Sequence, residues 1–208
     1  MQIKREHWDD GNLENYKPET MNMMQQSALK MKSQTEIQPA ASTIPQDMRN
    51  NVRIVELPSC KMVTSGPAKS EDAFAPGGKM ERFDKWATEY DKQRTDRFYP
   101  RDFMWSPVSG GFEWGSAVDE VPDDIGGFDV IDFPGGLYAV AISVDADGAD
   151  HDRVYNEILK WVNNSGCFVL DENGTRRSMG NITSPHLIKE VMGYQQMDLY
   201  FPIRIKEA

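Results

Sequence analysis

Two acidic residues in otherwise apolar segments are the main candidates for binding chemistry in this chain. Glu113 lies in FEWGSAV (residues 112–118) and Asp198 lies in MDLYFPI (197–203), and both segments have the composition of β-strands. A carboxylate on a buried strand face needs a partner, because an unpaired buried charge costs several kcal/mol or is neutralised by a shifted pKa. The partner is either a Lys or Arg of the chain or the positive charge of a ligand.

Other arrangements of reactive residues lack the spacing that their chemistry requires. The acidic run DADGADHD (145–152) resembles the start of a calcium loop, but Asp150 stands where the sharp turn needs Gly and Asn156 where the loop needs Glu. We therefore expect an acidic turn that caps a helix beginning near Asp150. His186 and Glu190 are four residues apart without a third ligand nearby. The sequence predicts no metal, no cofactor and no nucleophilic catalysis.

Composition restricts the class of partner. The 208 residues carry a formal net charge of −10, with 39% hydrophobic and 10% aromatic residues. Clustered Lys and Arg are missing, so direct nucleic-acid binding is not expected, and a cationic ligand or a protein partner suits the charge better. No apolar run approaches membrane-spanning length and no signal-peptide core is present, so we expect a cytoplasmic protein without a membrane segment. Cys60 and Cys167, far apart in sequence, are expected to be reduced thiols.

The chain divides into two parts by composition. Residues 1–50 are rich in Met, Gln, Asn, Ser and Thr and end in a proline-punctuated stretch, which is typical of a flexible segment or linker. Within it, residues 19–33 have the pattern of one helix. Residues 51–208 have the apolar content of a folded domain, so we expect them to hold the core.

An internal duplication organises residues 51–208. Pro134 follows Pro58 by 76 residues, each between two β-runs, and Trp161 follows Trp86 by 75 residues, each on a helical apolar stripe. Both tryptophans are expected to be core residues. Each helix is followed by strand-like segments, the last of which carries Glu113 or Asp198. The repeat unit is β-α-β-β, present twice.

Two such units predict an α+β fold. Packed about a pseudo-twofold axis, they give an antiparallel sheet with both helices on one face and a ligand cleft on the other. Strand alternation places Glu113 and Asp198 on the cleft face, where the two carboxylates should approach each other, and Trp114 and Leu199 on the helix face. The residues expected beside the carboxylates are Gly115, Ala117, Tyr200 and Pro202.

The second part of the chain, from 51 to about 206, resembles the GyrI-like effector-binding domain of AraC-type and MerR-type bacterial transcription regulators, which also occurs as a stand-alone protein. The resemblance rests on the order and spacing of RIVELP (53–58), GFEWGSAV (111–118), FPGGLYAV (133–140), LKWVNNSGCF (159–168) and DLYFPI (198–203). It implies a module that binds small, often cationic and aromatic, molecules in the cleft between its two halves.

The same resemblance implies roles for individual residues. In multidrug-sensing members an acidic residue four before the closing proline receives the ligand's positive charge, and here that residue is Asp198. Aromatic faces attract cations by roughly 0.5 to 2 kcal/mol, and the candidate walls are Trp105, Tyr138 and Tyr200; core packing is the alternative for both tyrosines. The family often has a Phe-Glu-x-Tyr pattern in the strand before the last, whereas this chain has HLIKE (186–190), so the ligand's identity does not follow.

Three functions remain open at this stage. We expect a ligand-binding module, either the sensor part of a regulator or a stand-alone binder, and a binding protein rather than an enzyme. One alternative is a hydrolase, because some relatives are reported to hydrolyse strained cyclopropane-containing compounds; Glu113, Asp198 and Tyr200 would supply a general base and an electrophilic hydroxyl. The other is a protein inhibitor similar to the gyrase-inhibitory member, with an acidic surface that mimics nucleic acid.

Overall fold

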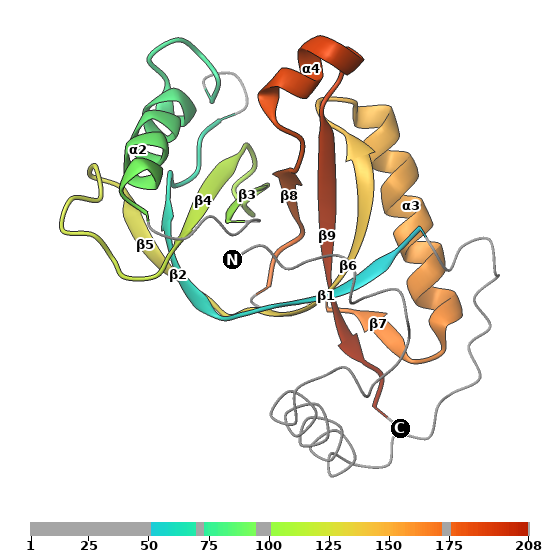
Figure 1. Cartoon of the computed structure of the whole chain (residues 1–208). Coiled ribbons are helices and arrows are strands. Elements are labelled where there is room, and N and C mark those ends of the chain that lie inside the picture. Colours follow the sequence, from blue (N-terminus) through green and yellow to red (C-terminus); the bar gives the residue numbers. More distant parts are fainter. Residues whose placement is uncertain (1–50, 70–72, 95–100, 172–175, 208) are drawn as a thin grey trace, which may run out of the picture. The chain divides into compact units, whose positions relative to one another are not determined.

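The structure, a computed structural model, describes residues 51–69, 73–94, 101–171 and 176–207 (Figure 1). The predicted N-terminal linker and its helix lie outside these residues. Within the described ranges, no helix is long and apolar enough to cross a membrane. Cys60 and Cys167 are free thiols, as predicted.

The predicted β-α-β-β unit is present twice. The first half contains β1 (Arg53–Leu57), β2 (Cys60–Thr64), α2 (Lys79–Gln93), β3 (Asp102–Trp105) and β4 (Glu113–Val118). The second half contains β5 (Asp129–Phe133), β6 (Gly136–Val144), α3 (Gly148–Ser165), β7 (Phe168–Leu170), β8 (Met179–Ile182), α4 (His186–Met192) and β9 (Gln196–Ile205). The repeated elements are therefore β2-α2-β3-β4 and β6-α3-β8-β9, to which the second half adds β7 and α4.

The strands form one antiparallel sheet in the order β1-β6-β9-β8-β3-β4-β2-β5, and β7 pairs with β9. The counterparts are β1 and β5, β2 and β6, β3 and β8, and β4 and β9. Exchanging each strand for its counterpart gives the same order read backwards, as expected for two halves related by a pseudo-twofold axis. The halves meet at β3 and β8, where Met104 lies opposite Gly180. The predicted α+β class with a duplicated antiparallel sheet is confirmed.

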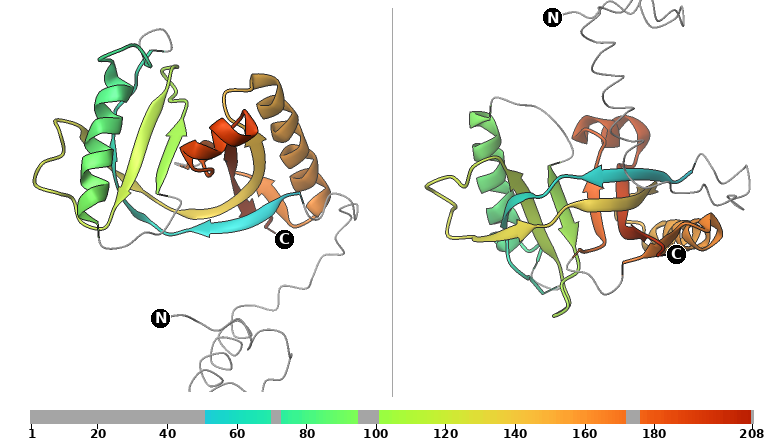
Figure 2. Two further views of the ribbon diagram at one scale, coloured as in Figure 1. Left: turned by 45° about the horizontal axis from the view of Figure 1, so that its top comes forward. Right: turned by 90° about the horizontal axis from the view of Figure 1, so that it is seen from below.

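A bent two-stranded ribbon also joins the halves. β1 and β2 pair with β6 and β5 respectively, and Pro58 and Pro134 interrupt the two long strands at the bend, where the loss of a backbone donor is tolerated. Gly135 takes a positive φ of 67°, and a Cβ there would lie 2.5 Å from the Leu57 carbonyl oxygen. Only glycine fits this turn. In Figure 2 the ribbon runs from the α2 half to the α3 half.

The acidic run 145–152 caps the N-terminus of helix α3. The Asp147 side chain accepts a hydrogen bond from the Asp150 backbone N–H and caps the helix, which ends at Gly166 in the left-handed conformation. The buried face of α3 carries Val154, Ile158 and Trp161. A capping turn, as predicted, therefore begins this helix.

Both helices cover the same face of the sheet. Trp114 packs with the α2 core around Phe83, and Leu199 packs with the α3 core around Ile158. The opposite face holds a separate cluster, which we call the aromatic core; it consists of Leu57, Met62, Phe103, Trp105, Phe133, Tyr138, Val140, Met179 and Tyr200. This division agrees with the strand alternation predicted for β4 and β9.

Candidate functional site

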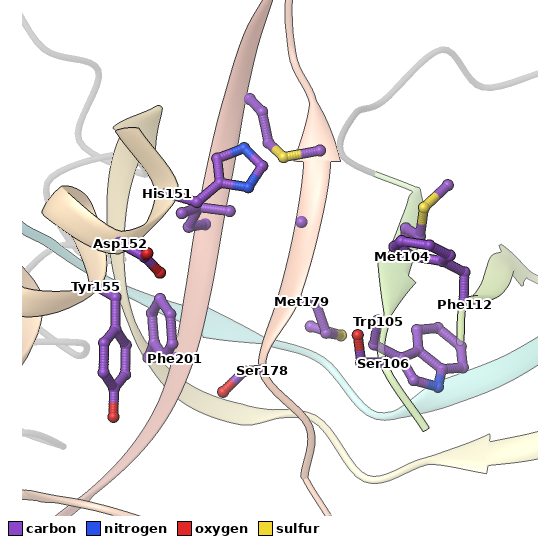
Figure 3. A pocket seen from close by; sticks show the side chains of 13 residues that line it. Met104, Trp105, Ser106, Phe112, His151, Asp152, Tyr155, Ser178, Met179 and Phe201 are labelled. Atoms are coloured by element: carbon purple, nitrogen blue, oxygen red, sulfur yellow. The ribbon is translucent and has the colours of Figure 1, made fainter. Parts of the chain in front are cut away.

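A groove between the two halves is the apolar concavity with the clearest fit to a small molecule. Its volume is about 320 Å³, within the range of small-molecule sites. The first half contributes Met104, Trp105, Ser106 and Phe112, and the second contributes His151, Asp152, Tyr155, Ser178, Met179, Gly180, Met197, Leu199 and Phe201. Figure 3 shows these side chains, with those of α3 facing Met104 and Phe112 across β8 and β9. We call this the inter-half groove.

The first turns of α3 supply the polar side of the inter-half groove. His151 places its Nε2 2.9 Å from the Val144 carbonyl oxygen. Because a carbonyl only accepts, Nε2 is the donor of this hydrogen bond. Asp152 is exposed beside it, and the Tyr155 ring lies 5.1 Å from that of Phe201. One end of the groove thus combines a carboxylate, an imidazole and two aromatic rings.

A second, more polar cavity of about 450 Å³ adjoins the inter-half groove. The two share Ser106, Tyr155, Ser178 and Phe201. The second cavity adds Arg176, whose guanidinium donates to the Asp171 carboxylate and to the Leu137 and Ile203 carbonyls. Since these bonds tie Arg176 to β6, to β9 and to the residue that follows β7, its role in the described fold is to brace the cavity wall.

The site residues predicted from the sequence fall on the other face of the sheet, except that Trp105 also contacts the inter-half groove. Tyr138 and Tyr200 are 0% and 3% exposed in the aromatic core, and Glu113 and Asp198 are each 6% exposed. The predicted cleft face is therefore a filled aromatic core, and the open groove lies on the helix face. The physical reason is that the aromatic rings on this face pack against each other and fill it, with ring centroids 5.3 to 6.4 Å apart.

Asp198 has partners from two elements. Its carboxylate accepts a hydrogen bond from Arg53 Nη2 at 2.6 Å and one from the Tyr200 hydroxyl. Burial, together with the negative charge of Asp198, raises the pKa of Tyr200 to about 12. The charge of Asp198 is therefore compensated by the chain itself.

Glu113 is held in a similar way by different residues. Its Oε2 accepts hydrogen bonds from Trp105 Nε1 at 3.0 Å and from Arg177 Nη1 at 3.1 Å. The Arg177 guanidinium also lies over the Trp105 ring, 5.3 Å from its centroid. Both carboxylates thus have an arginine partner, which is the first of the two alternatives that the sequence left open.

The structure does not bring the two carboxylates together. Glu113 is on β4 and Asp198 is on β9, with β3 and β8 between them; three strand spacings separate such positions by about 14 Å. The hydrolase alternative needed Glu113, Asp198 and Tyr200 in one place. Since the Tyr200 hydroxyl donates to Asp198 and Glu113 is bound by Arg177, the geometry does not favour that alternative.

The groove residues of α3 were missed because the pattern around them predicts only a buried stripe. Val154 and Ile158 face the core, whereas Tyr155 beside them is exposed and lines the groove. An exposed aromatic residue next to a buried stripe is a signal that could have been used.

Comparisons with known proteins identify the fold. No family model and no curated protein matches the sequence. The crystal structure of the EcmrR C-terminal domain has a TM-score of 0.50 at 12% identity, over 74% of this chain and 96% of that domain. EcmrR in its cryo-EM DNA complex has a TM-score of 0.51 at 11% identity, over 89% of this chain and 63% of that one. An uncharacterised conserved protein from Listeria innocua has a TM-score of 0.53 at 12% identity, over 74% and 92%. The chain therefore has the fold of the EcmrR C-terminal domain.

Proposed function

We propose that this chain binds a small aromatic cation in the inter-half groove, as a GyrI-like sensor module of a bacterial transcription regulator or as a stand-alone binding protein. The observation that carries the proposal is an apolar groove built from both halves of the duplicated fold, with a carboxylate at its edge. The fold shared with EcmrR, which is described in a DNA complex, supports the regulatory setting.

The chemistry of the inter-half groove suits an aromatic cation. Phe112, Tyr155 and Phe201 offer ring faces from both halves, and cation–π attraction contributes roughly 0.5 to 2 kcal/mol per well-placed ring. Asp152 adds one negative charge at the rim. The net charge of −10 favours the approach of cations over anions.

Isothermal titration with 1-methylquinolinium and its neutral counterpart quinoline tests the proposal. Phe201→Ala should weaken both ligands, because it removes a ring from the groove floor. Asp152→Asn should weaken only the cation, by roughly three- to fivefold, since an exposed charge pair contributes at most about 1 kcal/mol. Asp84→Asn, which makes the same change at an exposed position of α2, is the matched control. If Phe201→Ala leaves the affinity of both ligands unchanged, the groove is not the site.

A further inference from the structure

The side chain of Arg177 occupies a cation site of its own, formed by Glu113 and by Trp105, which also contacts the inter-half groove. Its guanidinium donates to the Glu113 carboxylate at 3.1 Å and lies 5.3 Å from the centroid of the Trp105 ring. A buried carboxylate and an indole face are the two groups that recognise organic cations in proteins. The described chain therefore fills with its own arginine a site whose chemistry also fits a ligand.

The carboxylate and the ring are fixed by the sheet. Trp105 and Glu113 are directly opposite each other on β3 and β4, and the indole N–H holds the carboxylate at 3.0 Å. The indole passes over Gly115, where a Cβ would lie 2.5 Å from Trp105 Cη2. Because strand residues with packed side chains hold their positions well, this half of the site is preorganised.

The arginine is held less firmly than its partners. The side chain of Arg177 is 46% exposed, whereas that of Glu113 is 8% exposed. Arg177 belongs to the coil before β8, outside the sheet ladder. Its departure into water would require no strand to move, provided that another cation takes its place on Glu113.

A cavity lies directly beside the guanidinium. Its volume is about 210 Å³. The residues that line it are Trp105, Ile131, Asp132, Phe133, Pro134, Arg177 and Met179. Most are apolar, and the carboxylate of Asp132 pairs with Lys61 at 2.6 Å. The cavity therefore has room and lining for the apolar part of a ligand whose cationic end reaches Glu113.

We propose that Trp105 and Glu113 form a second binding site, for a planar organic cation of the amidinium or guanidinium class, and that Arg177 occupies it as a displaceable internal competitor. The incoming cation donates its N–H groups to Glu113 and stacks on Trp105, while its apolar part fills the adjoining cavity. Glu113 stays paired throughout the exchange, which avoids the large cost of a buried unpaired carboxylate.

Titration calorimetry of the full-length chain with benzamidinium and its neutral isostere benzamide tests this site. An internal competitor that occupies the site about 90 to 99% of the time weakens the apparent affinity by roughly ten- to a hundredfold. Arg177→Gln should therefore bind benzamidinium at least tenfold more tightly than the wild type. Glu113→Gln should lose this binding, and benzamide should bind weakly to all variants. Arg204→Gln, the same charge change at an exposed position of β9, should match the wild type.

A second variant covers the case in which Arg177→Gln fails to fold. Arg177→Lys keeps the charge but loses the planar guanidinium, so this variant should compete less well for Glu113 than the wild type does. Its affinity for benzamidinium should lie between those of the wild type and Arg177→Gln. Equal benzamidinium affinity in the wild type and both Arg177 variants would overturn the proposal, and so would undiminished binding by Glu113→Gln. Phe201→Ala serves to separate the two sites, because it should weaken 1-methylquinolinium in the groove and leave benzamidinium binding by Arg177→Lys unchanged.

Discussion

Two tyrosine hydroxyls in the aromatic core have opposite surroundings, and removing each should change stability in opposite directions. Tyr138 is fully buried, and its hydroxyl has no hydrogen-bond partner among the described residues. Tyr200 is buried in the same cluster, with ring centroids 6.1 Å apart, but its hydroxyl donates to Asp198. Tyr138→Phe and Tyr200→Phe delete the same atom from the same buried cluster, so the difference between them reports the hydrogen bond.

The expected magnitudes follow from hydrogen-bond energetics. A buried hydroxyl without a partner costs about 1 to 3 kcal/mol, so Tyr138→Phe should raise the free energy of unfolding by about 1 kcal/mol. The expected gain is smaller than the full cost of the buried hydroxyl because the missing oxygen leaves a small void. A hydrogen bond to a charged acceptor contributes about 1.5 to 3 kcal/mol. Tyr200→Phe should therefore lower the free energy of unfolding by about 2 kcal/mol.

Urea unfolding followed by tryptophan fluorescence measures both changes. For a domain of this size, 1 kcal/mol corresponds to a shift of about 2 to 4 °C in Tm, so thermal unfolding provides an independent measurement. The double variant should fall between the two single variants. If Tyr138→Phe destabilises the chain as much as Tyr200→Phe does, the Tyr138 hydroxyl has a partner in solution and the reasoning fails.

Three further predictions concern other parts of the fold. Hydrogen bonds from Arg153, from the Val144 backbone N–H and from the Ser143 hydroxyl lower the pKa of Asp150 to about 2. The stabilisation by Asp150 is thus present above about pH 4 and lost as the pH falls toward 2. Asp150→Ala should therefore reduce the dependence of the free energy of unfolding on pH between about 4 and 2. Asp198→Asn removes the charge to which Arg53 and the Tyr200 hydroxyl donate, so urea unfolding should show a loss of about 1 to 3 kcal/mol, and an unchanged free energy of unfolding would count against this pairing. Gly115→Ala forces the Trp105 ring to move, so urea unfolding should show a loss of about 1 to 3 kcal/mol, and an unchanged near-ultraviolet circular dichroism spectrum would contradict it.

The sequence determined the architecture because its signals are local and repeated. The spacing of Pro58 and Pro134 marks the two bends of the ribbon, and the period-2 alternation in β4 and β9 separates the aromatic core from the helix face. The acidic residues before α3 predict its cap at Asp147. The alternation and the cap each depend on residues within a few positions of one another, and the proline spacing is a repeat visible in the sequence itself, so none of these predictions requires knowledge of a long-range contact.

The tertiary structure decided which groups meet. The arginines that neutralise Asp198 and Glu113 lie 145 and 64 residues away in sequence, respectively, and no local pattern predicts such pairs. The position of the open groove likewise depends on the assembled sheet. On one face the aromatic side chains pack together into a core. On the helix face the inter-half groove stays open between α3 and the strands of the first half. A sequence specifies which face of a strand a residue takes, but the curvature of the assembled sheet determines whether that face becomes a core or a cleft.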